Sequence, residues 1–179
     1  MKYFNIISSC IFFALVSCQV SDNKNKSDTS KSYKELTSAK YDAVAINNQV
    51  SSIQKGIVKV VDSVFKSDTT TVNQKISDAI FDFDISISRL ESIGKEHEVA
   101  DYFGNSVIKL IEFYKSEFEG EFISVVKVLK KIEVNETEKN FLNEYDQSFA
   151  NTEAVLFQDI LVRQDSFAKY FSIGLTDKL

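Results

Sequence analysis

The chain has 179 residues, with 21 basic and 26 acidic side chains and a formal net charge of −5. Nucleic-acid binders usually carry a basic face and a high pI, so this charge argues against that class. The chain has no proline, five glycines and a single histidine. Without proline, long helices can run unbroken, whereas an all-β fold would lack its usual turn residues. The 15 phenylalanines in a chain that is 44% hydrophobic supply a packed core, which excludes disorder throughout.

Residues 1–17 predict a bacterial lipoprotein signal peptide. An apolar segment from Ile6 to Val16 suits an h-region, because a membrane-spanning helix needs about 20 residues. It ends in the lipobox Leu15-Val16-Ser17-Cys18, so we expect cleavage before Cys18. The thiol of Cys18 would then take a diacylglycerol, and its amine a further acyl chain such as palmitate, which together anchor a protein stably. The alternatives are a plain secretory peptide with a chance cysteine, or a disulfide between Cys10 and Cys18.

Residues 18–32 comprise the lipidated cysteine and a segment of small, polar and charged side chains. This composition predicts a flexible tether. Gln19 stands where an aspartate would resemble the inner-membrane retention signal of enterobacteria. Its presence favours delivery to the outer membrane of the cell envelope, either on the periplasmic face or at the cell surface. Cys10 leaves with the signal peptide, so the mature chain is expected to have no intramolecular disulfide.

Residues 33–175 predict an all-α domain, an antiparallel up-down-up-down four-helix bundle of long helices. The first segment, about 33–65, carries a coiled-coil-like heptad stripe, formed by Leu36, Ala39, Ala43, Ile46, Val50, Ile53, Ile57, Val60 and Val64. The second segment is expected to open at a capping box of Thr71 with Gln74 and to stop near Gly94. Its stripe is Ile76, Ala79, Ile80, Phe83, Ile87 and Leu90.

The third segment is expected to run unbroken from about His97 to Ile132, with Gly104 and Gly120 inside it. Its stripe is Phe103, Val107, Leu110, Tyr114, Phe118, Phe122, Val125, Leu129 and Ile132. The fourth segment opens at a capping box of Asn135 with Glu138. Its expected inner line is Phe141, Tyr145, Phe149, Thr152, Leu156, Ile160, Arg163, Phe167 and Tyr170. Joints of about five residues make consecutive helices antiparallel neighbours.

The chain offers few candidates for catalysis or metal binding. Di-iron sites in four-helix bundles use Glu-x-x-His motifs, and the one histidine, His97, does not lie in one. No Gly-x-Ser-x-Gly, P-loop or Gly-x-Gly-x-x-Gly motif occurs. We therefore expect no catalytic residue, no cofactor and no metal site.

Acidic side chains do cluster along two segments: Asp78, Asp82 and Asp84, and Glu112, Glu117, Glu119 and Glu121. Paired carboxylates can serve acid–base chemistry. Beside Lys109, Lys115 and Lys127 they are more simply interpreted as solvated charges on helix faces.

The first joint contains Asp68-Thr69-Thr70. This tripeptide looks like the acceptor used for O-glycosylation in Bacteroidetes, with Thr69 as the modified residue. The alternative interpretation is a helix start signal, since Asp and Thr are common N-caps.

The helical part also resembles a family of uncharacterised surface lipoproteins of Bacteroidetes and Leptospira-like spirochaetes. The resemblance rests on Tyr41 with Asn47-Asn48, on Phe113-Tyr114-Lys115-Ser116, and on the segment Gln164 to Tyr170. It covers most of residues 33–175. It implies a lipid anchor and a helical fold, and it supplies no activity and no site residues.

The leading functional hypothesis is a lipid-anchored, non-enzymatic helical module that binds a protein partner or serves a structural role. We expect it to contact the membrane through its anchor and to bind no nucleic acid. One alternative is a carrier of a small apolar ligand, held between the aromatic-rich third and fourth helices. A third hypothesis, an enzyme that uses carboxylates, requires acidic residues with raised pKa values that share a cleft.

Overall fold

The computed structural model describes residues 19–21, 33–93, 98–172 and 174–176. Five helices make up the domain: α2 (Tyr33–Lys66), α3 (Thr69–Ser92), α4 (Glu98–Glu119), α5 (Glu121–Leu129) and α6 (Glu136–Phe171). A short antiparallel pair joins β1 (Gln19–Ser21) to β2 (Gly174–Thr176). The expected all-α domain is thus confirmed, although β1 gives structure to part of the segment expected to be a tether. No helix among these residues combines the length and apolar character that crossing a membrane requires.

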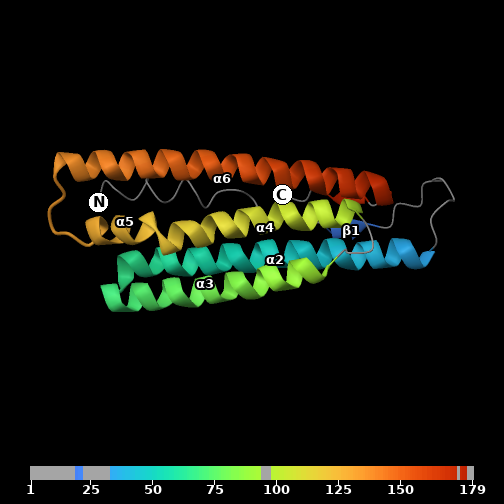
Figure 1. The fold of residues 1–179 in the computed structure, drawn as a ribbon, viewed down its shortest axis with the longest axis horizontal. Coiled ribbons are helices and arrows are strands. Elements are labelled where there is room, and N and C mark those ends of the chain that lie inside the picture. The colour runs from blue at the N-terminus through green and yellow to red at the C-terminus, as the bar shows by residue number, and fades with distance from the viewer. Residues whose placement is uncertain (1–18, 22–32, 94–97, 173, 177–179) are drawn as a thin grey trace.

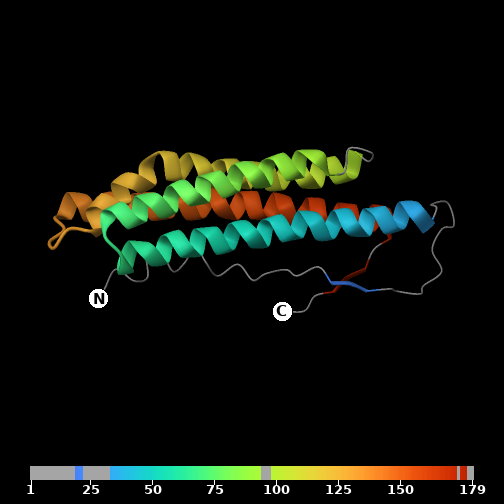
Figure 2. The same cartoon turned by 90° about the horizontal axis from the view of Figure 1, so that it is seen from below.

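The helices lie side by side along one long axis and form a helical bundle, in which α4 is seen between α6 and α2 (Figure 1). α4 packs against α2, α3 and α6, and α2 lies along α3 (Figure 2). Its contact with three other helices explains the wide buried face of α4. Its buried residues are Ala100, Phe103, Gly104, Ser106, Val107, Leu110, Ile111, Tyr114 and Phe118.

The heptad stripe of α2 faces the core as expected. Its buried members are Ala39, Ala43, Ile46, Ile53, Val60 and Val64, and Val50 and Ile57 are partly buried against them. The helix ends at Lys66, one residue after the expected end. A three–four spacing of apolar residues over this length places one continuous stripe on one side of a helix, so both the bounds and the buried face were predictable.

The start of α3 differs from the expectation. Asp68, not Thr71, is the N-cap: its Oδ1 accepts a hydrogen bond from the backbone N–H of Thr71 at 2.8 Å. Gln74, the expected partner in the capping box, instead donates to Asp78. The predicted box was wrong because the aspartate satisfies the free N–H groups one turn earlier. The predicted stop at Gly94 lies outside the described residues, and the helix itself ends at Ser92.

The third segment does not form one helix. Gly120 has φ −114° and ψ −110°, outside the helical region, and separates α4 from α5. A Cβ at this position would lie 3.0 Å from the carbonyl oxygen of Ser116, so the absence of a side chain permits the local path. α5 ends at Leu129, and Ile132, expected on the inner line, is fully exposed in the turn before α6.

The capping box of α6 is confirmed. The Asn135 side chain accepts from the Glu138 backbone at 2.9 Å, and the Glu138 side chain accepts from the Asn135 backbone at 3.0 Å. On the expected inner line, Ile160 and Phe167 are buried, and Phe141, Tyr145, Phe149 and Leu156 are partly buried against the core. Thr152, Arg163 and Tyr170 are exposed, whereas Glu153, Gln164 and Phe171 are buried one position later. The helix therefore buries two polar side chains that a search for apolar periodicity passes over.

Candidate functional site between α4 and α6

The most unusual residue in the described interior is Glu153 on α6, a glutamate that is only 4% exposed. Tyr114, buried on α4, donates its hydroxyl to Oε1 of Glu153 at 2.6 Å. Burial raises the pKa of the Glu153 carboxyl above its ordinary value, and the hydrogen bond from Tyr114 partly opposes this rise. No lysine or arginine in the described part of the chain contributes to this shift. A buried carboxylate with one donor and no cation is costly, so its position needs an explanation.

A second carboxyl, on α4, also lies beside a tyrosine of the opposite helix. Glu117 lies one turn after Tyr114 and is half-buried, and its partner is Tyr145 of α6. Burial raises the pKa of Glu117, the neighbouring side chain of Tyr145 opposes this rise, and the charge of Glu121 adds to it. Each helix thus contributes one tyrosine and one glutamate to its contact with the other.

Aromatic rings surround these two pairs. The ring centroids of Phe113 and Phe149 lie 5.0 Å apart, those of Tyr114 and Phe149 6.0 Å, and those of Tyr145 and Phe149 5.8 Å. Phe83 of α3 closes the cluster from the other side at 6.4 Å from Tyr114. Such rings exclude water, and the low local dielectric is the physical cause of the raised carboxyl pKa values.

The second buried polar residue of α6 joins it to α2. Nε2 of Gln164 donates to Oδ1 of Asn47 at 3.1 Å. This bond connects two helices that otherwise approach each other closely at few positions. Together with Glu153, it fixes which side of α6 faces the core.

Burial raises the pKa values of Glu117 and Glu153, as is common for acid–base groups, but the described residues bury the side chain of Glu153. Two hollows on the surface lie elsewhere, along α3 and between α3 and α4. One is lined by Asp84, Ile85, Ser88, Arg89 and Ser92, and the other by Ile87, Glu112, Lys115, Ser116, Glu119 and Gly120. Between them Lys115 binds Asp84 at 2.6 Å. The carboxyl of Glu153 can take up and release a proton inside the core.

The structure describes only some of the residues selected from the sequence. Cys18 and His97 lie outside the described residues. Thr69 is exposed in the first turn of α3, directly after the Asp68 cap. The acidic groups of α3 and α4 are exposed, as expected of solvated charges, with the exception of Glu117.

The sequence did not identify Glu153. The spacing of Phe149, Leu156 and Ile160 could have identified it. Steps of three and four residues between these apolar side chains place residue 153 on the inward face of the helix. Within the described residues no group of histidine, cysteine or carboxylate side chains could hold a metal ion. No known family, curated protein or solved structure matches the chain.

Proposed function

We propose that this chain is a bacterial lipoprotein of the cell envelope whose helical domain acts as a non-enzymatic binding or structural module. In this proposal residues 1–17 are removed, Cys18 carries the lipid, and residues 33–175 form an up-down-up-down bundle that is presented from the outer membrane. The single observation that carries it is the lipobox Leu15-Val16-Ser17-Cys18, which follows directly on an apolar segment of h-region length.

The described interior supports a module over an enzyme. The more deeply buried of the two carboxyls whose pKa is raised, that of Glu153, is enclosed by side chains of α4 and α6. Several acidic residues that solvent reaches pair with lysines, as in the contact of Lys115 with Asp84. A polar group inside a helical interface can specify how two helices are paired, which is a structural role.

The packing of the described interior also affects the alternative proposal that the protein carries a small apolar ligand. A ligand between the third and fourth predicted segments would occupy the space between α4 and α6. The rings of Phe113 and Phe149 already contact each other there. This packing favours a filled core and a function carried by the outer surface.

The anchor is tested by replacing Cys18 with alanine in the full chain. We expect the wild type to partition into the detergent phase after phase separation of cell extracts, and Cys18→Ala to partition into the aqueous phase. Cys10→Ala is the matched control, because it removes the other cysteine of the chain and should leave partition unchanged. Detergent-phase Cys18→Ala would exclude lipidation at this residue. A pull-down from crosslinked cells with wild type and Cys18→Ala would then identify the partner.

A further inference from the structure

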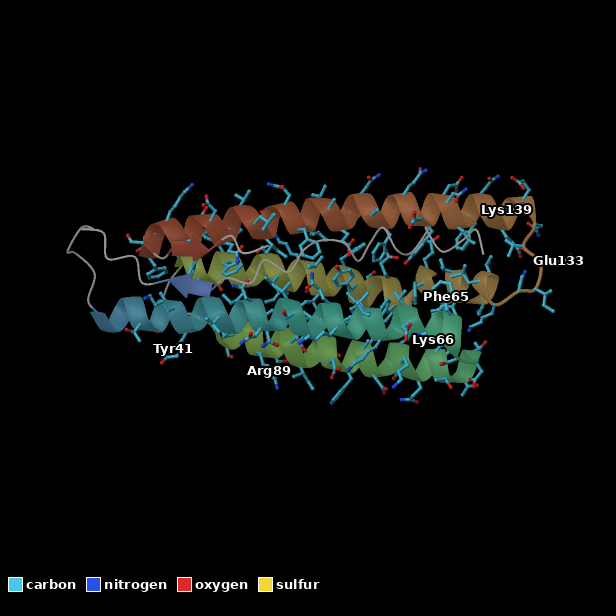
Figure 3. The ribbon with its side chains drawn as sticks, turned by 180° about the vertical axis from the view of Figure 1, so that it is seen from behind. Tyr41, Phe65, Lys66, Arg89, Glu133 and Lys139 are labelled. Atoms are coloured by element: carbon cyan, nitrogen blue, oxygen red, sulfur yellow. The ribbon has the colours of Figure 1, made fainter. Side chains whose placement is uncertain are left out.

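α6 has a second line of regularly spaced side chains, on the side that faces away from the bundle. In Figure 1 α6 forms one edge of the bundle, with the other helices all on one side of it, and Figure 3 shows side chains projecting outwards from that edge. Steps of three and four residues place one line of side chains on one side of a helix. On the outer side of α6 they select an outer stripe of exposed residues: Ser148, Asn151, Val155, Gln158, Val162 and Ser166.

The outer stripe contains no charged residue. Between Gln147 and Gln158 the one charged side chain of α6 is Glu153, which is buried against Tyr114 of α4. The exposed residues of α4, by contrast, include several charged ones: Glu98, Asp101, Lys109, Glu112 and Glu119. Depletion of charged residues, more than bulk hydrophobicity, distinguishes the core of a protein interface from the rest of a surface. The outer stripe shares this feature, and its valines are 69% and 50% exposed.

A charged residue continues the spacing at each end of the outer stripe, and the two charges have opposite signs. Glu144 lies four residues before Ser148, and Lys169 lies three residues after Ser166; both are exposed. If two copies of α6 lie side by side in opposite directions, Glu144 of each copy faces Lys169 of the other. Parallel copies would instead bring the two glutamates together and the two lysines together. Charge complementarity therefore selects the antiparallel pairing.

The antiparallel register that pairs these charges also matches the outer stripe to itself. The residues that face each other across the two copies are Glu144 and Lys169, Ser148 and Ser166, Asn151 and Val162, and Val155 and Gln158. Each contact then occurs twice about one two-fold axis, as in an isologous interface. The small serine side chains let the two helices approach closely, and the amides of Asn151 and Gln158 can form hydrogen bonds across the seam.

The size of this seam predicts a weak and reversible dimer. From Glu144 to Lys169 it is about 38 Å long, at a rise of about 1.5 Å per residue, and a helix with its side chains is about 10 Å wide. The seam would thus bury about 400 Å² on each copy, which is about half of a standard interface. We therefore expect exchange between monomers and dimers, as in transient complexes.

We propose that a second copy of this chain binds along the outer stripe, with the two α6 helices antiparallel. This inference goes beyond the proposed function, because it identifies one partner of the helical domain. It does not depend on the lipid at Cys18.

Disulfide trapping in cells tests this pairing in the full chain. Two differently tagged copies are produced together, one with Ser148→Cys and the other with Ser166→Cys, and the cells are treated with a membrane-permeant oxidant. We expect a linked dimer that contains both tags, because the two positions face each other. Two tagged copies that both contain Ser148→Cys are the matched control. In the antiparallel dimer these cysteines lie about 27 Å apart, and a disulfide requires Cα atoms within about 7 Å.

The wild-type chain, treated in the same way, measures any linkage through Cys10 or Cys18. Absence of a mixed dimer above this level overturns the proposal. Trapping of the Ser148→Cys control to the same extent as the mixed pair also overturns it. So does a Ser148→Cys chain that links to a different protein and not to the Ser166→Cys chain.

A charge placed in the seam gives a second test. Val162→Lys in both copies of the mixed pair should lower the yield of linked dimer at least about tenfold, since burying an unpaired charge is costly. Val44→Lys on α2 is the matched control, because Val44 is 42% exposed and Val162 50%, and it should leave the yield unchanged. Circular dichroism checks that both variants keep their helices. A yield that both substitutions lower equally, or that neither lowers, would refute the role of the outer stripe.

Discussion

Replacing Glu153 with glutamine should stabilise the domain at neutral pH. Burial raises the pKa of Glu153, so the folded state disfavours the charged form relative to the unfolded chain. Each unit between the folded and unfolded pKa corresponds to about 1.4 kcal/mol. Glutamine has nearly the same shape, carries no charge and still offers an oxygen to the hydroxyl of Tyr114. We expect a gain on the order of 1 kcal/mol, after the loss of a charge-assisted hydrogen bond is subtracted.

The sign of the pH dependence follows from proton binding. Because the folded pKa of Glu153 is raised, the folded state binds more protons than the unfolded state at pH values between the ordinary value, 4.5, and the folded value. The contribution of Glu153 to the stability of the wild type therefore becomes more favourable as the pH falls through this window, and its penalty is complete above it. Asp68 and Glu138, whose pKa values are lowered, give the opposite dependence in both proteins and cancel in the difference.

Urea unfolding of the non-lipidated mature chain, followed by circular dichroism at about pH 7.5 and about pH 4.5, measures this difference. Glu153→Gln should exceed the wild type at the higher pH and approach it at the lower one. Tyr114→Phe is the complementary variant: it keeps the ring, removes the donor and should destabilise by about 1.5–3 kcal/mol at the higher pH. In the Glu153→Gln background its cost should be smaller. A Glu153→Gln protein that is less stable than the wild type by the same amount at both pH values would refute the reasoning.

Three further changes test local features. Asn135→Ala removes the N-cap of α6 and should lower the free energy of unfolding by about 1 kcal/mol. Asn143, exposed in the same helix, is the control, and Asn143→Ala should not destabilise the domain. Equal losses in the two variants would show that the Asn135 cap does not stabilise the helix. Gly120→Ala places a Cβ 3.0 Å from the Ser116 carbonyl oxygen. This contact should destabilise the domain by about 1 kcal/mol and lower its melting temperature by several degrees. An unchanged melting temperature would show that the break between α4 and α5 does not require glycine. Thr69→Ala should remove any added sugar mass from protein isolated from its native host, and an unchanged intact mass would exclude O-glycosylation at this residue.

The parts of the fold that follow one repeating rule could be predicted from the sequence. α2 keeps its apolar side chains on one stripe from Ala39 to Val64, and the structure buries that stripe. The cap of α6 depends on two residues three apart, Asn135 and Glu138, and it is found as expected. In both cases local spacing decides the outcome, since neither needs information about which helix lies opposite.

The predictions that were wrong concern features that depend on contacts between distant segments of the chain. The α4–α5 break was not predicted, because Gly120 alone signals either an interruption or a close approach of helices. The inner line of α6 was misplaced at Thr152 and Arg163 because Glu153 and Gln164 occupy the inward positions. Nothing local indicates that a glutamate will be buried. Its partner, Tyr114, lies 39 residues earlier in the chain.

The rotation of α6 about its own axis depends both on its local apolar pattern and on its contacts with distant segments. Apolar side chains on this helix are spread widely enough that Val155, Leu161 and Val162 remain exposed, so burial of apolar surface alone would tolerate more than one rotation. Glu153 can reach Tyr114 of α4, and Gln164 can reach Asn47 of α2, only when both face inward. A rotation that exposed either would leave a buried polar partner unsatisfied, at a cost of about 1–3 kcal/mol for each. The buried polar pairs thus select one packing of α6 among those that the hydrophobic core permits.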